Sequence, residues 1–512
     1  MLASGLIAVL AQRELGAGSM SGVAQNVLFG RTVSLSADGN RVAVGAPQED
    51  ASNPYVARVG AVYIYDYDGL SDRWTSSAVI RGAWQYEEAG YGLDMAGDGT
   101  LLAIGHRKYD SQRGRACIYE FKGSAWLPLH QCTEGFAGND NHGWSVSIAD
   151  DGGTWAVGAP RHSGGGSMFV YYTQRSTPLF QKPTQGTEAT GYAVSHPSST
   201  CVAVSLPGAN NFQGHVNVYN ISQLPNGPVT QIGGTIQGVA NAAAGLGFSV
   251  SMDASCSTLV VGSPYAQPSW TPNWPNNGFN GAGSITVYQL IGQKWTEVFA
   301  HNGAMGDGLG FAVDISRDGN TVAASAPRHA AAPSSQLFVG RVVAFRKCPS
   351  AWTAVMTLDG AQPLPSFGIG TSLSLSGNGA RLAYGAHTTN TDTGTAHVVE
   401  VTECDTSLYP RPPPMPAAPV PPPSRGAPSP PAAISKSLFW FIVAVCAAIV
   451  LGIATCRSLS VRLVTVPEDA QAMPNLSGEP APPPLPPPPA PPPPAPPPAP
   501  PSPNQPAQAT PA

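Results

Sequence analysis

The sequence predicts an all-β fold, a seven-bladed β-propeller, followed by a disordered proline-rich stalk, one transmembrane helix and a disordered polyproline tail. Two observations support this prediction. One short phrase recurs seven times before residue 405, and the composition changes abruptly after that point. We divide the 512-residue chain into an N-terminal segment, the repeats, a stalk, a membrane span and a tail, at residues 1–28, 29–405, 406–436, 437–456 and 457–512.

Each copy of the repeat begins with a glycine close to an aromatic or similar residue. A tight turn follows, and then a short apolar strand that ends in Gly-Ala-Pro or a variant. The first copy, "FGRTVSLSADGNRVAVGAP", runs from Phe29 to Pro47. Recurrence at a roughly constant spacing of about 50–60 residues is typical of repeat architectures such as propellers. We place the opening glycines at Gly30, Gly92, Gly143, Gly191, Gly247, Gly310 and Gly368.

Four short strands are expected in each copy. Runs of Val, Ile, Tyr and Phe bounded by Gly, Asp, Asn and Pro indicate strands and tight turns. The second strand, such as "VAVGAP" at 42–47, is apolar on both faces and built of small residues, so it should be buried near a crowded axis. The third and fourth strands carry the Tyr and Trp residues that fill wider outer layers. Seven four-stranded units around a channel form a propeller.

Both chain ends are expected to complete the last blade. The seventh copy lacks a fourth strand, because proline-rich sequence begins shortly after Cys404. Residues 5–13, within "LIAVLAQRELGAG", stand where that strand would precede the first copy, and their pairing would remove an open sheet edge. The alternative is a signal-peptide remnant, although no basic region precedes the apolar stretch. On the strand interpretation, an export signal would lie upstream of this sequence.

The C-terminal region predicts a stalk and a membrane anchor. The segment Pro410–Pro431 cannot build a core and is expected to adopt extended polyproline II geometry. Ser437–Cys456 then contains twenty residues without a charge, between Lys436 and Arg457. A helix rises about 1.5 Å per residue, so this segment spans about 30 Å, which matches a bilayer core. A buried core helix is the alternative, but the bracketing charges favour a membrane span.

The repeated pattern of Phe-Gly, an Asp-Gly turn and Gly-Ala-Pro resembles the FG-GAP repeats of the integrin α-chain N-terminal β-propeller. The resemblance covers residues 29–405, with 5–28 as the closing segment. The full phrase stands intact only in the first copy; the second has "IGHR" at 104–107 and the fourth "VSLP" at 204–207. The resemblance implies an extracellular ring that binds ligands and mediates adhesion. Because the chain has no leg domains and no visible insertion domain, it does not imply an integrin-like heterodimer.

The resemblance also implies Ca²⁺ in acidic loops between strands, where carboxylate and carbonyl oxygens surround one hard cation. The densest acidic cluster here is "DYDGLSD", which offers Asp66, Asp68 and Asp72 as candidate cation ligands between strands three and four of the first blade. An ordinary hairpin turn is the alternative. Most first turns keep one aspartate before glycine, which favours a simple hairpin turn at Asp38, Asp98, Asp151 and Asp318.

Cysteines and a sequon are compatible with the secretory pathway. Six cysteines precede the predicted span, and an even number suits an oxidising compartment. Cys117 and Cys132 fall on strands three and four of the second blade, about equally far from their turn, and form a disulfide candidate. "NIS" makes Asn220 a glycosylation candidate at an exposed turn. The sequence gives no pairing for Cys201, Cys256, Cys348 and Cys404.

The tail is a candidate adaptor-binding segment. "PPPLPPPPAPPPP", residues 482–494, forms a polyproline II rod of the kind that aromatic grooves of SH3, WW, EVH1 or profilin-type partners bind. An inert spacer is the alternative. The apolar-plus-proline motif that an EVH1 groove accepts consists of Leu485, Pro486, Pro487, Pro488 and Pro489.

Together these features predict a single-pass, type I protein of the plasma membrane or another secretory-pathway membrane, adhesion- or receptor-like, whose propeller binds an extracellular protein or glycan. Only 11% of residues are charged and the net charge is −5, which excludes a basic footprint for nucleic acid. The charges flanking the span do not set its orientation. Histidines are scattered and no catalytic motif is present, so we expect no enzyme. The alternatives are a carbohydrate- or cell-wall-binding surface protein and a propeller enzyme.

Overall fold

The computed structural model describes residues 13–404, apart from short gaps at 17–19, 53, 185, 187, 240–243, 267–280, 331, 333–336, 350, 362–363, 365–366 and 389–392. Within this described part, no helix has the length and apolarity needed to cross a membrane. The predicted stalk, membrane span and tail, residues 406–512, lie outside the described residues.

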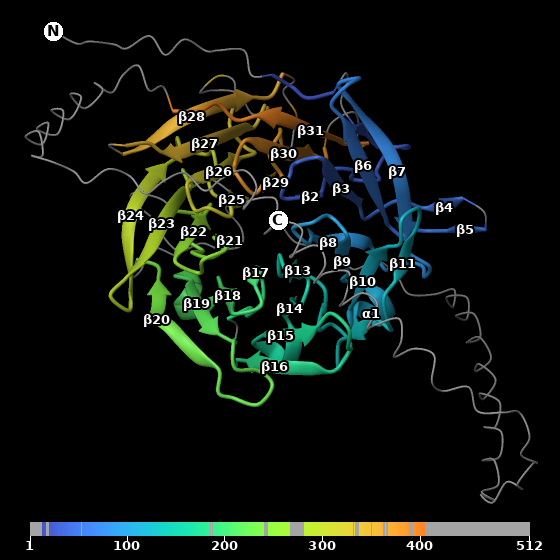
Figure 1. The fold of residues 1–512 in the computed structure, drawn as a ribbon, viewed down its shortest axis with the longest axis horizontal. Coiled ribbons are helices and arrows are strands. Elements are labelled where there is room, and N and C mark those ends of the chain that lie inside the picture. Colours follow the sequence, from blue (N-terminus) through green and yellow to red (C-terminus); the bar gives the residue numbers. More distant parts are fainter. Residues whose placement is uncertain are drawn as a thin grey trace, which may run out of the picture. The chain divides into compact units, whose positions relative to one another are not determined.

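Seven antiparallel sheets stand around a common axis, so the predicted seven-bladed β-propeller is confirmed (Figure 1). From the innermost strand outward, blade 1 consists of β2 (Thr32–Leu35), β3 (Arg41–Ala46), β6 (Ala61–Asp68) and β7 (Arg73–Arg81). Blade 2 consists of β8 (Ala89–Met95), β9 (Leu101–His106), β10 (Arg115–Phe121) and β11 (Trp126–Pro128). Blade 3 consists of β13 (Ser145–Ile148), β14 (Thr154–Ala159), β15 (Ser167–Tyr172) and β16 (Pro178–Pro183).

The remaining blades follow the same order. Blades 4 to 7 are β17 (Val194–Ser198), β18 (Cys201–Leu206), β19 (His215–Asn220) and β20 (Thr230–Gln237); β21 (Ser249–Met252), β22 (Thr258–Ser263), β23 (Ser284–Ile291) and β24 (Lys294–Asn302); β25 (Val313–Ile315), β26 (Thr321–Ala326), β27 (Arg341–Lys347) and β28 (Trp352–Asp359); and β29 (Ser372–Leu375), β30 (Arg381–Ala386), β31 (Thr395–Glu400) and β1 (Met20–Ser21).

A few short elements decorate the blades. The strands β4 (Ala51–Ser52) and β5 (Tyr55–Val56) form a small hairpin in the first blade, and β12 (Thr133–Glu134) adds a second outer partner to β10. Three single-turn elements lie in loops between second and third strands. They are α1 (Tyr109–Gln112), the 3₁₀ turn η1 (His162–Gly164) and α2 (Ala209–Phe212).

The ring closes through both chain ends. Each innermost strand contacts the innermost strands of its two neighbours, and β29 of the last blade contacts β2 of the first. On the outside of blade 7, Met20 of β1 pairs with Ala396 of β31, and an isolated bridge joins Glu14 to Val399. Residues 5–12, most of the segment expected to supply this strand, lie outside the described residues. The outer strand that the structure describes is Met20–Ser21.

Facing glycines explain why the phrase repeats. The opening glycine of each blade has a φ of 83–89°, which suits glycine. At five of the seven junctions its carbonyl oxygen lies against a glycine in the second strand of the preceding blade. A Cβ on Gly158 would lie under 3.0 Å from the carbonyl oxygen of Gly191. The positive φ values occur at Gly90 and Gly370, so placing these two openings at Gly92 and Gly368 was wrong by two residues.

The second strands are buried on both faces, as their composition predicts. Five of the six residues of β3 are buried, and all six of β14 are. The apolar core therefore lies in layers between adjacent blades, where large side chains pack over the small second strands. Between blades 2 and 3, the fully buried Trp155 and Phe169 pack against Ala103 and Ile118.

Three disulfides join the strands, and two of them cross between blades. Cys117 of β10 is bonded to Cys132, which lies between β11 and β12 of the same blade. The other two bonds link neighbouring blades at sequence separations of 55 and 56, close to one repeat length; they are Cys201–Cys256, between blades 4 and 5, and Cys348–Cys404, between blades 6 and 7.

We predict that Gly158→Ala destabilises the propeller by about 1–3 kcal/mol, because the added methyl group has no room between blades 3 and 4. Thermal and urea unfolding of the full chain measure the change. Gly69→Ala is the matched control, since its Cβ would meet only Tyr67 at 3.8 Å. Equal stability of the two variants would contradict the close approach of the blades.

Candidate functional site

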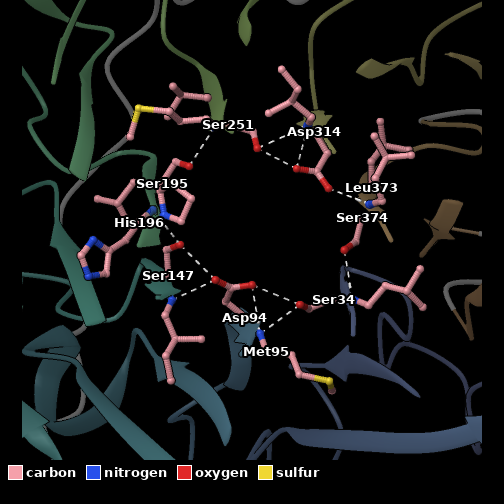
Figure 2. A pocket seen from close by; sticks show the side chains of 18 of the residues that line it. Ser34, Asp94, Met95, Ser147, Ser195, His196, Ser251, Asp314, Leu373 and Ser374 are labelled. Carbon is pink, nitrogen blue, oxygen red and sulfur yellow. Dashed lines mark hydrogen bonds between the residues drawn. The ribbon is translucent and has the colours of Figure 1, made fainter. Parts of the chain in front are cut away.

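A ring of polar side chains lines the channel. One polar residue of each innermost strand points into it, so the seven blades contribute five serines and two aspartates around one opening (Figure 2). The cavity at this level has a volume of about 270 Å³. We call this set the polar ring; it consists of Ser34, Asp94, Ser147, Ser195, Ser251, Asp314 and Ser374.

Each member of the polar ring accepts a hydrogen bond from a backbone N–H of the next blade. Such bonds are needed because innermost strands are sheet edges, whose N–H groups would otherwise lack partners. Ser374 of blade 7 accepts from Leu35 of blade 1 at 2.9 Å, which completes the circle. The other six donor–acceptor pairs are Met95–Ser34, Ile148–Asp94, His196–Ser147, Met252–Ser195, Ile315–Ser251 and Leu375–Asp314, at 2.6–3.4 Å.

The two carboxylates of the polar ring are held by protein donors. Asp94 accepts from the hydroxyls of Ser34 and Ser147 at 3.1 and 3.0 Å, and Asp314 accepts from Ser251 at 2.7 Å. Burial raises the pKa of Asp94, and it raises the pKa of Asp314 to about 6, although these hydrogen bonds oppose the shift. This arrangement gives both groups a structural role in joining blades.

An ion pair reaches across one end of the channel. The guanidinium of Arg317, in the first turn of blade 6, donates to the Asp150 carboxylate of blade 3 at 2.6 Å. Both residues line the same cavity as the polar ring. Burial raises the pKa of Asp150 to about 6 despite the arginine. The turn side of the channel is thereby obstructed by the chain's own charges.

The opposite end of the channel is framed by aromatic rings. In blades 2 to 6 the residue after the opening glycine is aromatic, and consecutive ring centroids lie 5.0–5.4 Å apart. In blade 7 that position is Thr371, and Phe367 continues the series at 5.6 Å from its neighbour. We call this set the aromatic mouth; it consists of Tyr91, Trp144, Tyr192, Phe248, Phe311 and Phe367.

Two arginines complete the aromatic mouth. Arg31 occupies the equivalent position of blade 1, donates to the Tyr91 hydroxyl at 3.2 Å and lies 4.9 Å from its ring centroid. Arg107 lies 3.8 Å from the same centroid, and its Nε bonds Glu88 at 2.7 Å. The enclosed space is about 230 Å³, and its aromatic members are partly exposed. Such a mouth can stack against a ligand and donate hydrogen bonds to it.

The acidic residues proposed as cation ligands bind protein groups. Asp66 forms an ion pair with Arg41 at 2.6 Å, Asp68 accepts from the Ser71 hydroxyl at 2.6 Å, and Asp72 accepts from the Tyr67 hydroxyl at 2.6 Å. These hydrogen bonds lower the pKa of Asp68 and of Asp72. The described residues contain no cluster of three or more His, Cys, Asp or Glu that could hold a metal ion.

The other residues singled out in the sequence either form local hydrogen bonds or lie outside the described residues. Asn220 ends β19, and its side-chain oxygen accepts from the Ser222 amide at 3.0 Å. The polyproline motif at 485–489 is outside the described residues. The turn aspartates each accept bonds within their own hairpin, as a structural turn requires; they are Asp38, Asp98, Asp151 and Asp318.

Neither the polar ring nor the aromatic mouth was anticipated from the sequence. Both carry a signal at fixed positions of the repeat. The aromatic residue directly follows the opening glycine, as in Gly143-Trp144, and the polar residue is the fourth after that glycine, as in Ser147. The pattern becomes visible only when all seven copies are aligned on the correct glycine.

We predict that Asp314→Asn makes the pH dependence of stability shallower. Burial raises the pKa of Asp314 to about 6. The contribution of its neutral carboxyl to the stability of the fold is therefore complete below about pH 4, and it is lost as the pH rises through 6. Thermal unfolding midpoints between pH 4 and 7 measure this. Ser195→Ala, in the same ring, should lower the midpoint without changing the slope. An unchanged slope in Asp314→Asn would show that the carboxyl titrates normally.

Comparison with known proteins adds no family name to this geometry. The structure itself establishes the seven-bladed propeller, and the channel and its aromatic mouth provide the basis for a functional proposal. No family model matches the chain, and no curated protein matches it.

Proposed function

We propose that this chain is a single-pass surface protein whose propeller, similar to the FG-GAP propellers of integrin α-chains, faces outward and binds a ligand at the aromatic mouth. The observation that carries the proposal is the unbroken series of aromatic side chains from blades 2 to 7 around one end of the channel. The function is adhesion- or receptor-like binding.

The aromatic mouth is not needed to close the ring. The polar ring already joins every pair of neighbouring blades, and facing glycines pack five of the seven pairs together. Aromatic side chains supply large, rigid contact area at a low cost in conformational entropy, which is why binding surfaces use them. Arg31 adds a planar donor to this surface, 3.2 Å from the Tyr91 hydroxyl. These groups together favour a ligand that stacks and accepts hydrogen bonds.

Two features support the outward orientation. The three disulfides within the propeller suit an oxidising compartment. The sequon at Asn220 lies at the turn between the third and fourth strands of blade 4, and Ser222 is exposed there. The apolar segment 437–456 would anchor the chain, which would leave the polyproline motif at 485–489 inside, available to an SH3, WW, EVH1 or profilin-type partner.

We predict that Trp144→Ala and Phe248→Ala each reduce adhesion of cells displaying the full chain by roughly tenfold, because each removes a stacking face from the aromatic mouth. Attachment to an extracellular matrix preparation under flow measures this, with surface expression matched by antibody. Ile291→Ala, at an exposed turn of blade 5, is the control. Undiminished attachment of both mouth variants would refute this binding site.

We predict that the propeller is accessible from outside the cell and the tail is not. One epitope tag is inserted beside Leu70, which is fully exposed, and a second follows Pro503. Protease added to intact cells should remove the first tag and spare the second. Protection of the propeller tag, with loss of the tail tag, would reverse the proposed orientation while leaving the binding test of the mouth unaffected.

A further inference from the structure

We propose that two adjacent loops on blades 1 and 2 form a binding site for a neutral oligosaccharide. The loops are residues 82–88, which connect β7 to β8, and residues 107–114, which contain α1 (Figure 1). They enclose a groove of about 610 Å³ that shares no lining residue with the channel or the aromatic mouth. We call it the outer groove; its principal residues are Trp84, Gln85, Tyr86, Tyr109, Asp110 and Gln112.

Aromatic faces are presented to solvent in the outer groove. Trp84 is 58% exposed and Tyr86 is 52% exposed, which is unusual for side chains of this size. Tyr109 from the second loop meets Trp84 edge to face, with ring centroids 6.3 Å apart. The guanidinium of Arg115 lies 4.3 Å from the Tyr109 centroid and holds that ring in place. The groove thus offers flat apolar surfaces at fixed angles.

The backbone of both loops is strained. The φ angles of Tyr86, Asp110, Ser111 and Gln112 lie between 44° and 64°, although none of these residues is glycine. Left-handed backbone costs about 1–2 kcal/mol for each such residue. Strain of this kind persists where the surrounding structure fixes it, and it clusters at binding and catalytic sites. The last three residues of α1, Asp110–Gln112, line the groove.

Buried charges hold the two loops together. Glu87 is fully buried; it accepts from the Trp84 amide at 3.0 Å and pairs with Arg115 of β10 at 2.7 Å. Glu88, also buried, pairs with Arg107 at 2.7 Å and with Lys108 at 2.8 Å. Breaking a buried pair is costly, so these contacts fix one loop against the other. The groove is therefore formed before a ligand arrives, which reduces the entropic cost of binding.

The chemistry of the outer groove fits a neutral sugar. A pyranose ring has apolar C–H faces, which stack on aromatic rings, and hydroxyls around its edge, which need both donors and acceptors. Gln85, Ser111 and Gln112 supply amide and hydroxyl groups of both kinds beside the aromatic faces. The charged members are already paired, Lys108 with Glu88 and Asp110 with Arg113 at 3.3 Å. This balance favours an uncharged ligand.

The test is binding of fluorescent full-length protein, in detergent micelles, to an array of immobilised saccharides. The array carries neutral oligosaccharides of glucose, galactose, mannose, arabinose and N-acetylglucosamine, together with galacturonate oligomers and a polyproline peptide. We expect binding to at least one neutral oligosaccharide. Trp84→Ala should weaken it roughly tenfold, whereas Trp84→Phe should retain part of it.

Two matched variants separate binding in the outer groove from binding elsewhere on the propeller. Val239→Ala changes an exposed apolar residue at the equivalent loop of blade 4 and should bind as wild type. Trp144→Ala, in the aromatic mouth, should also leave saccharide binding unchanged, so failure of the mouth and failure of the outer groove are distinguishable. The proposal is overturned if folded protein binds no neutral saccharide, prefers galacturonate or polyproline, or is insensitive to Trp84→Ala.

Discussion

A circle of hydrogen bonds around the channel is the constraint on which the rest of the structure depends. Each innermost strand donates a backbone N–H to a Ser or Asp side chain of the preceding blade, and the bond between Leu35 and Ser374 joins residues 339 positions apart. A propeller buries its blades only against one another, so a single open seam would expose an edge. The circle leaves no seam among the seven blades.

The repeated phrase now has a physical meaning. Its opening glycine turns the chain at a positive φ, and the polar residue four positions later joins the next blade. The glycine that ends its second strand, where present, leaves room for the carbonyl of the next opening glycine. The residue after the opening glycine has none of these structural roles. The chain places aromatic residues there, and blades 2 to 6 thereby form most of the aromatic mouth.

Sequence patterns predicted the propeller because repetition and strand composition are local signals. The sequence did not identify the opening glycine of every copy. In the second blade Gly90 and Gly92 are two residues apart, and only the positive φ of Gly90 shows that it opens the blade. The two disulfides between blades were not paired, since their partners approach only after the ring closes. The outer groove could not be predicted from the sequence, because its left-handed turn, Asp110–Gln112, contains no glycine or asparagine that would indicate such a turn.

The closed circle is tested most directly by hydrogen exchange of the backbone amides that enter the polar ring. In the full chain, the amide of Leu35, at the seam between the last and first blades, should be protected as strongly as that of Ile148, inside the array. Fast exchange at Leu35 beside slow exchange at Ile148 would show that the ring opens at its seam, and the circular constraint would be wrong.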